Sequence, residues 1–255
     1  MNPRIAHWQG KHVWIIGASS GIGAAVARAL LAQGANVALS GRRVEALRAQ
    51  AGGHRHAVIA PLDVEDAASV AAACDALLQS WPHFDLVLIV AGAYNEMRAD
   101  SFDLATARHI VDVNLGGVLN CLAPVLPVLL RQNAGALGLV SSVAGFRGLP
   151  KALAYGPAKA AVINLAETLY LDLRPRGIGV HLINPGFVDT PMTAANDFAM
   201  PALLTADQAA QAILRGLRRG QFHIHFPRRF TNWLRLLRLL PYRWYFRLVH
   251  QATGL

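Results

Sequence analysis

The sequence predicts an α/β fold built as one doubly wound parallel sheet with helices on both faces. Apolar runs alternate with helical patterns along the chain, and this alternation is typical of parallel sheets with crossover helices. The apolar runs are nearly continuous, as expected for strands buried on both faces. At 255 residues, of which 54% are hydrophobic and 15% charged, the chain suits one domain with a substantial core.

Six apolar runs are interpreted as strands, at residues 13–16, 36–40, 56–60, 84–90, 136–141 and 178–183. Helical patterns occupy residues 22–33, 44–51, 66–79, 104–131 and 152–174. Gly34 and the pair Gly52-Gly53 stand where glycine commonly ends a helix. Residues 186–205 are irregular and predict a long loop, of the length of a mobile active-site lid.

Composition excludes several classes of protein. Two cysteines, Cys74 and Cys121, are too few for a disulfide framework and suit a reducing cytoplasm. The first residues show neither the apolar core nor the small-residue cleavage site of a signal peptide. The apolar stretch at residues 118–130 contains two prolines and is too short to span a bilayer, so we expect a buried helix there.

The net charge of +9 is concentrated at one end of the chain. Nine arginines and no Asp or Glu follow Asp207, whereas the first 207 residues carry 15 basic and 15 acidic groups. We therefore divide the chain into a main domain at residues 1–226 and a basic amphipathic extension at residues 227–255.

The extension combines arginine with leucine and aromatic side chains. Arg235 and Arg238 are three residues apart and Arg243 and Arg247 four, so helices here would carry a cationic stripe, with a break at Pro241. Two interpretations stay open: peripheral contact of residues 228–250 with anionic lipid, and packing over the substrate cleft or a partner subunit. We expect a cytoplasmic protein, lying against the inner membrane face in the first case, and no binding of nucleic acid.

A glycine-rich turn follows the first predicted strand and opens the first helix. It contains Gly17, Ser19, Ser20, Gly21, Ile22 and Gly23. Glycine permits unusual backbone angles and close approach, while the free amides at a helix N-terminus suit a pyrophosphate. The strand–turn–helix context makes this a strong prediction of a dinucleotide site.

Charged residues after the second and third strands bear on the choice of dinucleotide. Gly41 stands where an acid would bind the ribose hydroxyls of NAD, and Arg42 and Arg43 follow it. Arginine favours the 2′-phosphate of NADP(H); the alternative is that both side chains are solvated charges at a helix start. Asp63, followed by Val64, is placed either to accept a hydrogen bond from adenine or to cap a helix.

Tyr155 and Lys159 are four residues apart, about one helical turn, so the phenol and the ammonium can share a helix face. A lysine charge about 5 Å away is worth about 3 kcal/mol at an effective dielectric of about 20, which would lower a phenol pKa by about two units. The pair therefore predicts a tuned proton donor near neutral pH.

Together these residues resemble the short-chain dehydrogenase/reductase family, over residues 11–219. The resemblance rests on the glycine turn, Asp63, Asn114, Ser142, the Tyr155/Lys159 pair, and Asn184-Pro185-Gly186 with Thr190. Ser142 precedes Tyr155 by 13 residues, which also fits the family. The resemblance implies a Rossmann-type fold and a homodimer or homotetramer paired through the helices at 104–131 and 152–174.

The resemblance also implies roles. Tyr155 is the general acid or base, Lys159 lowers its pKa and holds the nicotinamide ribose, Ser142 binds the substrate oxygen, and Asn114 holds a proton-supplying water. The implied cofactor site comprises Gly17, Ser19, Ser20, Gly21, Ile22, Gly23, Arg42, Arg43, Asp63, Val64, Ala91, Gly92, Asn114, Tyr155, Lys159, Pro185, Gly186, Val188 and Thr190.

The fourth strand departs from the family pattern. The family usually has Asn-Asn-Ala-Gly at its end, whereas this chain has Ile89-Val90-Ala91-Gly92. The small Ala91-Gly92 pair still allows the backbone to approach a cofactor, but Ile89 and Val90 can only pack. We expect cofactor binding to survive and the anchoring of this strand to differ.

These observations predict an NADP(H)-dependent oxidoreductase that interconverts a ketone or aldehyde and an alcohol, with a hydrophobic small-molecule substrate. The alternatives are an NAD-linked alcohol dehydrogenase and a dinucleotide-binding scaffold without turnover. We expect no metal site, because His223 and His225 alternate as on a strand surface without an evident third ligand.

Overall fold

Seven parallel strands form the central sheet of the computed structural model, which describes residues 1–194 and 200–254. The strands are β1 His12–Ile16, β2 Asn36–Ser40, β3 Ala57–Ile59, β4 Leu86–Ile89, β5 Ala136–Val140, β6 Gly179–Pro185 and β7 His223–Phe226. Their order across the sheet is β3-β2-β1-β4-β5-β6-β7, and every neighbouring pair is parallel. The predicted doubly wound α/β fold is confirmed.

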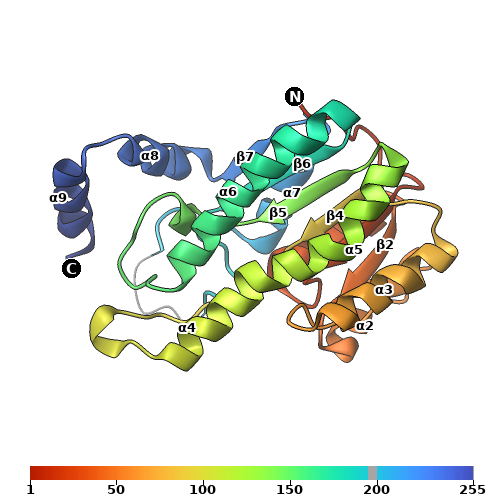
Figure 1. Ribbon diagram of the computed structural model, residues 1–255, viewed down its shortest axis with the longest axis horizontal. Helices are drawn as coiled ribbons and strands as arrows, with labels where there is room; N and C mark the ends of the chain where they lie inside the picture. Colours follow the sequence, from red (N-terminus) through yellow and green to blue (C-terminus); the bar gives the residue numbers. More distant parts are fainter. Residues whose placement is uncertain (195–199, 255) are drawn as a thin grey trace.

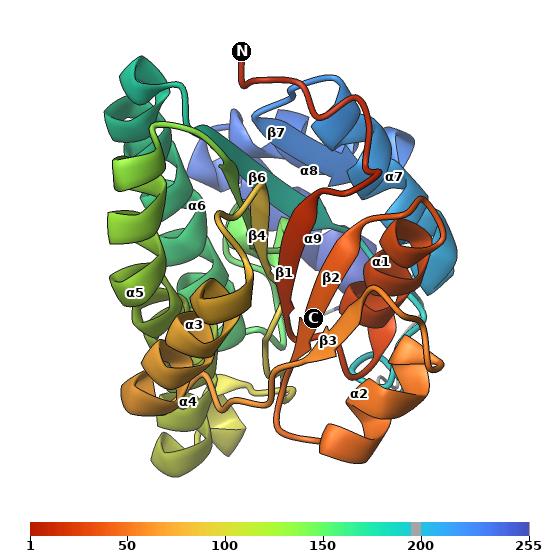
Figure 2. The same ribbon diagram turned by 90° about the vertical axis from the view of Figure 1, so that its right-hand side faces the viewer.

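Helices cover both faces of this sheet (Figure 1). The helices are α1 Gly21–Leu31, α2 Val44–Ala51, α3 Ala67–Ser80, α4 Leu104–Val111, α5 Gly117–Gln132, α6 Tyr155–Leu173, α7 Ala206–Arg218, α8 Arg228–Arg238 and α9 Tyr242–Thr253. Figure 2 shows α3, α5 and α6 on one face and α1, α2 and α7 on the other. The two main apolar clusters lie on these two faces of the sheet.

The strand order reverses between β1 and β4, because the chain runs outward from β1 to β3 and then returns to β4. Ligands of doubly wound sheets bind at such a switch point, beyond the carboxyl ends of the strands. The topology therefore places the glycine turn after β1, the end of β4 and the end of β5 around one crevice.

The predicted helix at residues 104–131 is one helical run with a change of pitch in the middle. Between α4 and α5, residues Asp112–Gly116 form a π-helical turn that contains Asn114. Half of the most apolar part of Leu104–Gln132 is buried, and although this run is long and apolar enough to cross a membrane, core helices pass the same test. We regard it as a core helix because α5 packs along α3 and against the sheet.

Several predicted boundaries need correction. The strands predicted at 56–60 and 84–90 are shorter, because β3 is only Ala57–Ile59 and β4 ends at Ile89. The helix predicted from residue 152 begins at Tyr155, since residues 152–154 form turns. The sequence analysis also missed α7, whose start is marked by a reciprocal hydrogen-bonded cap between Thr205 and Gln208.

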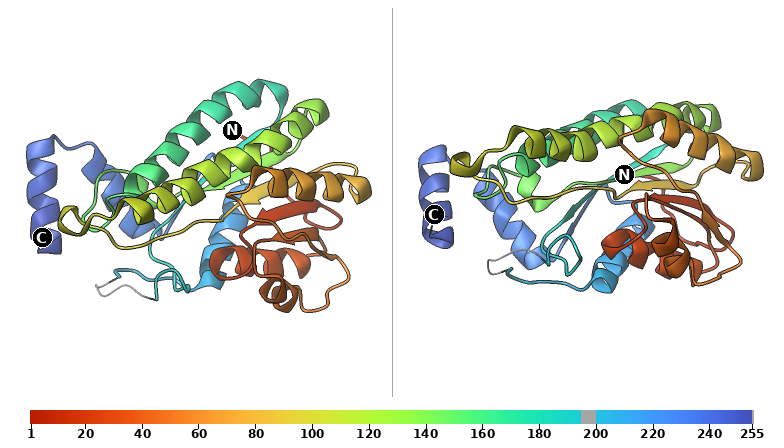
Figure 3. Two further views of the ribbon diagram at one scale, coloured as in Figure 1. Left: turned by 60° about the horizontal axis from the view of Figure 1, so that its bottom comes forward. Right: turned by 90° about the horizontal axis from the view of Figure 1, so that it is seen from below.

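The loop predicted at 186–205 lies partly outside the described residues, since 195–199 are not among them. Of the described part, Val188 forms an isolated parallel bridge with Leu204. The division of the chain at residue 227 stays a prediction. Pro241 separates α8 from α9 as expected. Figure 3 shows these two helices at one end of the molecule.

Candidate active site

A cleft of about 370 Å³ opens at the carboxyl ends of the strands. It is lined by the glycine turn, the segment after β2, the end of β4, the end of β5, the start of α6 and the segment after β6. All the predicted site residues line it except Gly23 and Asn114, which lie directly behind lining residues. Residues that are far apart in the sequence, and that were predicted to form one site, thus meet at one cleft.

The glycine turn is folded so tightly that two of its glycines have no room for a side chain. Gly17 has φ +99°, and a Cβ there would lie 2.5 Å from the backbone nitrogen of Ala91. A Cβ on Gly23 would lie 2.1 Å from the carbonyl oxygen of Gly17. The turn therefore packs its own backbone against β4 and presents the N-terminus of α1 to the cleft.

Arg43 lies against the glycine turn. Its guanidinium donates hydrogen bonds of 3.1 Å to the hydroxyls of both Ser19 and Ser20. Arg42 points instead to the acids after β3, with its nitrogen 3.9 Å from Asp63 and 4.0 Å from Glu65. Both arginines are exposed at the same edge of the cleft, so this edge carries guanidinium groups beside hydroxyl donors.

Ser142, Tyr155 and Lys159 meet at the wall of the cleft. Ser142 follows β5 directly, and its hydroxyl accepts the backbone N–H of Ala144 at 3.1 Å and shares a hydrogen bond with Tyr155. Tyr155 and Lys159 occupy the first turns of α6, with the Lys159 Nζ 5.7 Å from the centre of the Tyr155 ring. The ammonium donates to the carbonyl oxygen of Val140 at 3.0 Å, which ties α6 to the end of β5.

The predicted lowering of the tyrosine pKa is not found. Burial raises the pKa of Tyr155 to about 12, against a lowering effect of the Ser142 hydrogen bond and a further raising effect of Tyr94. Tyr94 is a site residue that the sequence analysis missed, and its ring lies edge-on to Tyr155 with centroids 5.1 Å apart. Burial also lowers the pKa of Lys159 to about 8. The phenol is therefore held protonated, and the amine is the group that titrates close to neutral pH.

Asn114 lies behind these groups, in the π-helical turn. Its Nδ2 donates to the carbonyl oxygens of Ala93 at 2.7 Å and Ile110 at 2.8 Å, so the wide turn is held open by the side chain itself. Its Oδ1 is buried and has no hydrogen-bond partner among the described residues. A Cβ on Gly92 would lie 2.9 Å from this Oδ1 and 3.5 Å from Lys159 Nζ, so Gly92 leaves space between the amide and the amine.

The segment after β6 closes the other side of the cleft. Asn184 Nδ2 donates to the carbonyl oxygen of Ser142 at 2.8 Å, joining β6 to the loop after β5. The Thr193 hydroxyl donates to the carbonyl oxygen of Val188 at 2.6 Å, and the Thr190 side chain lies beside Gly21 of the glycine turn. The backbone and hydroxyls of residues 185–193 therefore face the glycine turn across the cleft.

The family profile described as short chain dehydrogenase matches residues 11–199. An uncharacterized oxidoreductase of Myxococcus xanthus is 36% identical over 234 residues, 89% of this chain and 91% of its own. A solved short chain dehydrogenase/reductase family protein is 26% identical with a TM-score of 0.75, covering 86% of this chain and 97% of its own. A solved actinorhodin polyketide ketoreductase with NADPH matches in fold, with a TM-score of 0.77, 22% identity and coverage of 87% and 97%.

The chain belongs to the short-chain dehydrogenase/reductase family. It is accordingly an oxidoreductase acting on CH–OH or C=O groups with a nicotinamide dinucleotide. The residues of the cleft fit such a cofactor, because the N-terminus of α1 faces the cleft without a side-chain cap and, among the described residues, the buried Asn114 Oδ1 has no hydrogen-bond partner.

Short-chain dehydrogenases usually anchor β4 through asparagine side chains, and this chain uses its backbone instead. The amides of Val90 and Ala91 both donate to the carbonyl oxygen of Ile16, at 2.8 and 2.9 Å. Ile89 is buried in the core. The end of β4 is thus joined to β1 by backbone hydrogen bonds, at the place where Ile89 and Val90 replace the family's asparagines.

Sequence reasoning missed several residues that line the cleft, among them Glu65, Met192 and Thr193. Met192 lies within reach of Gly92, since its terminal methyl would be 3.8 Å from a Cβ there. These residues carry no motif; the segment after β3 brings Glu65 to the site, and the loop after β6 brings Met192 and Thr193.

The described residues also contain one group of potential metal ligands away from the cleft: His12, His83 and Asp85. The carboxylate of Asp85 is already paired with the Lys11 ammonium at 2.8 Å and accepts the backbone N–H of His12 at 2.8 Å. A cation there would have to displace the lysine, so we assign the group a structural role.

Proposed function

We propose that this protein is an NADP(H)-dependent reductase of a hydrophobic ketone or aldehyde, with Tyr155 as the general acid. The observation that carries the proposal is the meeting of Ser142, Tyr155 and Lys159 on one wall of a cleft whose opposite wall is the glycine turn. NADP(H), when bound, would supply the hydride.

The chain itself would orient the carbonyl and move the proton. The Ser142 hydroxyl donates to the carbonyl oxygen and stabilises the negative charge that develops there. Tyr155 transfers its phenolic proton to the same oxygen, and the ammonium of Lys159 stabilises the phenolate that remains. A raised pKa favours this direction, because the acid must begin the reaction protonated.

Arg42 and Arg43 support a preference for NADP(H) over NAD(H). They flank the edge of the cleft after β2, where Gly41 leaves no acid to bind a ribose diol. Arg43 is already oriented by the serines of the glycine turn, and a 2′-phosphate placed there would meet both guanidinium groups.

We further propose a cytoplasmic homo-oligomer. Leu119 on α5 and Leu171 on α6 are 49% and 72% exposed, and burial of such side chains between copies would follow the family's usual pairing through these helices. The hydrophobic substrate and the peripheral membrane contact of residues 228–250 are supported by the apolar surface of the C-terminal helices.

Replacing Tyr155 with Phe tests the enzymatic role. The variant keeps the ring but removes the acid, so NADPH oxidation with a panel of ketones and aldehydes should fall by at least about a hundredfold. NADPH binding, measured by fluorescence titration, should change little. Turnover near that of the parent protein would rule out Tyr155 as the acid and leave the scaffold alternative.

Replacing Arg42 with Asp tests the cofactor preference. The change should lower NADPH affinity by about tenfold to a hundredfold, because it removes one charge-assisted contact and adds a repelling carboxylate. NADH affinity should rise, since a carboxylate can accept hydrogen bonds from the ribose hydroxyls. If the parent protein binds NADH as tightly as NADPH, the preference proposed here is wrong.

A further inference from the structure

Helices α8 and α9 lie outside residues 11–199, which the family profile matches, and they expose a large apolar surface. Six apolar residues of these helices and of the C-cap of α8 are between 52% and 80% exposed: Trp233, Leu236, Leu239, Tyr242, Trp244 and Phe246. Four of the five exposed aromatic side chains of the described residues lie here, which singles this surface out from the scattered apolar residues of an ordinary surface.

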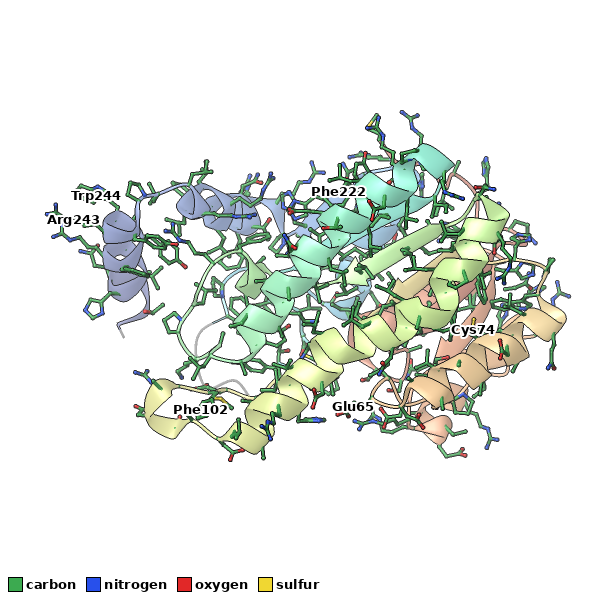
Figure 4. The ribbon with its side chains drawn as sticks, viewed as in Figure 1. Glu65, Cys74, Phe102, Phe222, Arg243 and Trp244 are labelled. Atoms are coloured by element: carbon green, nitrogen blue, oxygen red, sulfur yellow. The ribbon has the colours of Figure 1, made fainter. Side chains whose placement is uncertain are left out.

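The same surface is strongly basic. Six exposed arginines lie in α8 and α9: Arg228, Arg229, Arg235, Arg238, Arg243 and Arg247. None forms a salt bridge within the described residues, and the sequence has no Asp or Glu after Asp207. Figure 4 shows Arg243 and Trp244 projecting together from α9, away from the rest of the molecule.

These helices are clamped to the loop between Ser142 and Tyr155. The guanidinium of Arg147 donates to the carbonyl oxygens of Leu237, Arg238 and Leu240 at 3.1, 3.3 and 2.7 Å, at and just beyond the C-terminal end of α8. It also stacks 4.5 Å from the ring centre of Tyr242 and 4.1 Å from that of Tyr245.

Tyr245 completes the clamp. Its side chain is 2% exposed, and its hydroxyl donates to the carbonyl oxygen of Gly148 at 2.7 Å. At the other end of α8, Thr231 is fully buried and bonded to His225 on β7 at 2.6 Å. The exposed apolar and basic side chains are therefore presented by helices fixed to the catalytic domain.

We propose that α8 and α9 form a docking arm that binds the anionic headgroups of a lipid bilayer and sets the mouth of the cleft against it. Arginine with tryptophan and leucine suits the interface of an anionic bilayer, and the arm is too charged to enter the hydrocarbon. The arm is bonded to the loop between Ser142 and Tyr155, two residues that line the cleft, so a lipid-like carbonyl would reach Tyr155 from the bilayer surface; this last point rests on the function proposed above.

A second copy of the chain is the competing occupant. Symmetric pairing through this surface would bring the unpaired arginines of both copies together, and no acidic residue of the arm is available to neutralise them. Anionic lipid supplies that charge. The observations therefore favour the bilayer.

The tryptophans give a direct test, because only those of the arm are exposed. Trp8, Trp14 and Trp81 are buried in the catalytic domain, at 2%, 0% and 6% exposure. The full chain is titrated with vesicles of phosphatidylcholine alone and of phosphatidylcholine with phosphatidylglycerol. We expect a blue shift of tryptophan emission and co-sedimentation with the anionic vesicles, both weakened by salt, and at least about tenfold weaker binding to neutral vesicles.

The double change Arg243→Gln with Arg247→Gln should weaken binding to anionic vesicles by about tenfold or more. The matched control, Arg48→Gln with Arg55→Gln, removes the same charge from exposed positions far from the arm and should bind as the parent does. Equal losses in both pairs would show a general charge effect and overturn the proposal.

Two further measurements distinguish lipid binding by the arm from pairing of two copies, and from the proposed enzymatic function. If the parent binds no vesicles and the change Trp244→Ser lowers its oligomeric mass in ultracentrifugation, the arm is an interface between copies and the proposal is wrong. NADPH oxidation with the panel of ketones and aldehydes named above, hydrophobic ones included and dispersed without vesicles, reports on the proposed function alone. Absence of turnover across the whole panel would overturn that function and leave the result on lipid standing.

Discussion

At the scale of single residues, burial decides the protonation of the catalytic groups. The sequence places an amine one helical turn from a phenol, and on that spacing alone the phenol pKa should fall. The fold instead buries the pair, raising the pKa of Tyr155 to about 12 and lowering that of Lys159 to about 8. Sequence spacing gave the distance between the groups but could not give their desolvation, which depends on residues such as Tyr94.

The pH dependence of the reaction should report Lys159 rather than Tyr155. Below about pH 8 the lysine is charged and can stabilise the phenolate that forms on Tyr155, so kcat/KM for the reduction should be constant there. Above that pH, kcat/KM should fall by about tenfold per pH unit as the ammonium is lost.

A pH–rate profile of the parent and of Lys159→Arg checks this prediction. Arginine stays charged throughout the range, so the break near pH 8 should vanish even if the maximal rate is lower. A break that persists in the variant would assign the titration to another group.

At the scale of elements, the sequence predicted most of the sheet and its first helices, because parallel strands buried on both faces leave long apolar runs. The predicted edge strand was too long, because β3 is short and partly exposed. The sequence analysis overlooked α7, although a cap at Thr205 and a buried apolar face mark this helix. The residues of the candidate site were found where a motif marked them. They were missed in the segments after β3, β4 and β6 that carry no motif, because their contact with the site depends on the folded chain.

The turn between β1 and α1 has no room for a side chain at Gly23. In Gly23→Ala the new Cβ would lie 2.1 Å from the Gly17 carbonyl oxygen, so the turn must open. NADPH affinity should fall by about tenfold or more, in line with the roughly 1–3 kcal/mol that overpacking costs.

Gly116→Ala is the matched control for that change. Gly116 has helical backbone angles, and no atom of the described residues lies within 4 Å of the Cβ that alanine would add, so NADPH affinity should be unchanged. Fluorescence titration of both variants measures the difference, and equal affinities would show that the close approach of Gly23 to Gly17 does not shape the cofactor site.

At the scale of the whole molecule, the histidines of the last two strands couple stability to pH. His181 on β6 is fully buried, bonds through Nδ1 to the carbonyl oxygen of Gln221 at 2.6 Å, and has its pKa lowered to about 4 by burial. Burial likewise lowers the pKa of His223 and His225 to about 4. Each is held neutral in the folded protein and would be charged at acid pH in the unfolded chain.

Because the folded pKa of His181 lies below the unfolded value of 6.5, its contribution is complete above pH 6.5 and is lost as the pH falls toward 4. The loss should approach about 3 kcal/mol in the free energy of unfolding. Urea unfolding of the parent and of His181→Asn between pH 7 and pH 4.5 checks this. The variant should show a shallower decline, and parallel curves would exclude His181 as a source.

The π-helical turn at Asp112–Gly116 means that the chain carries one residue more than a regular α-helix would need at this place. Deleting a residue there would let the ordinary ladder of hydrogen bonds close through the run. Since each residue advances an α-helix by about 100°, the deletion would also rotate Asn114 off the space beside Gly92. The additional residue makes the backbone less regular, and it directs the Asn114 side chain toward the space between Gly92 and Lys159. A chain shortened here should therefore fold more easily and catalyse the reaction less well.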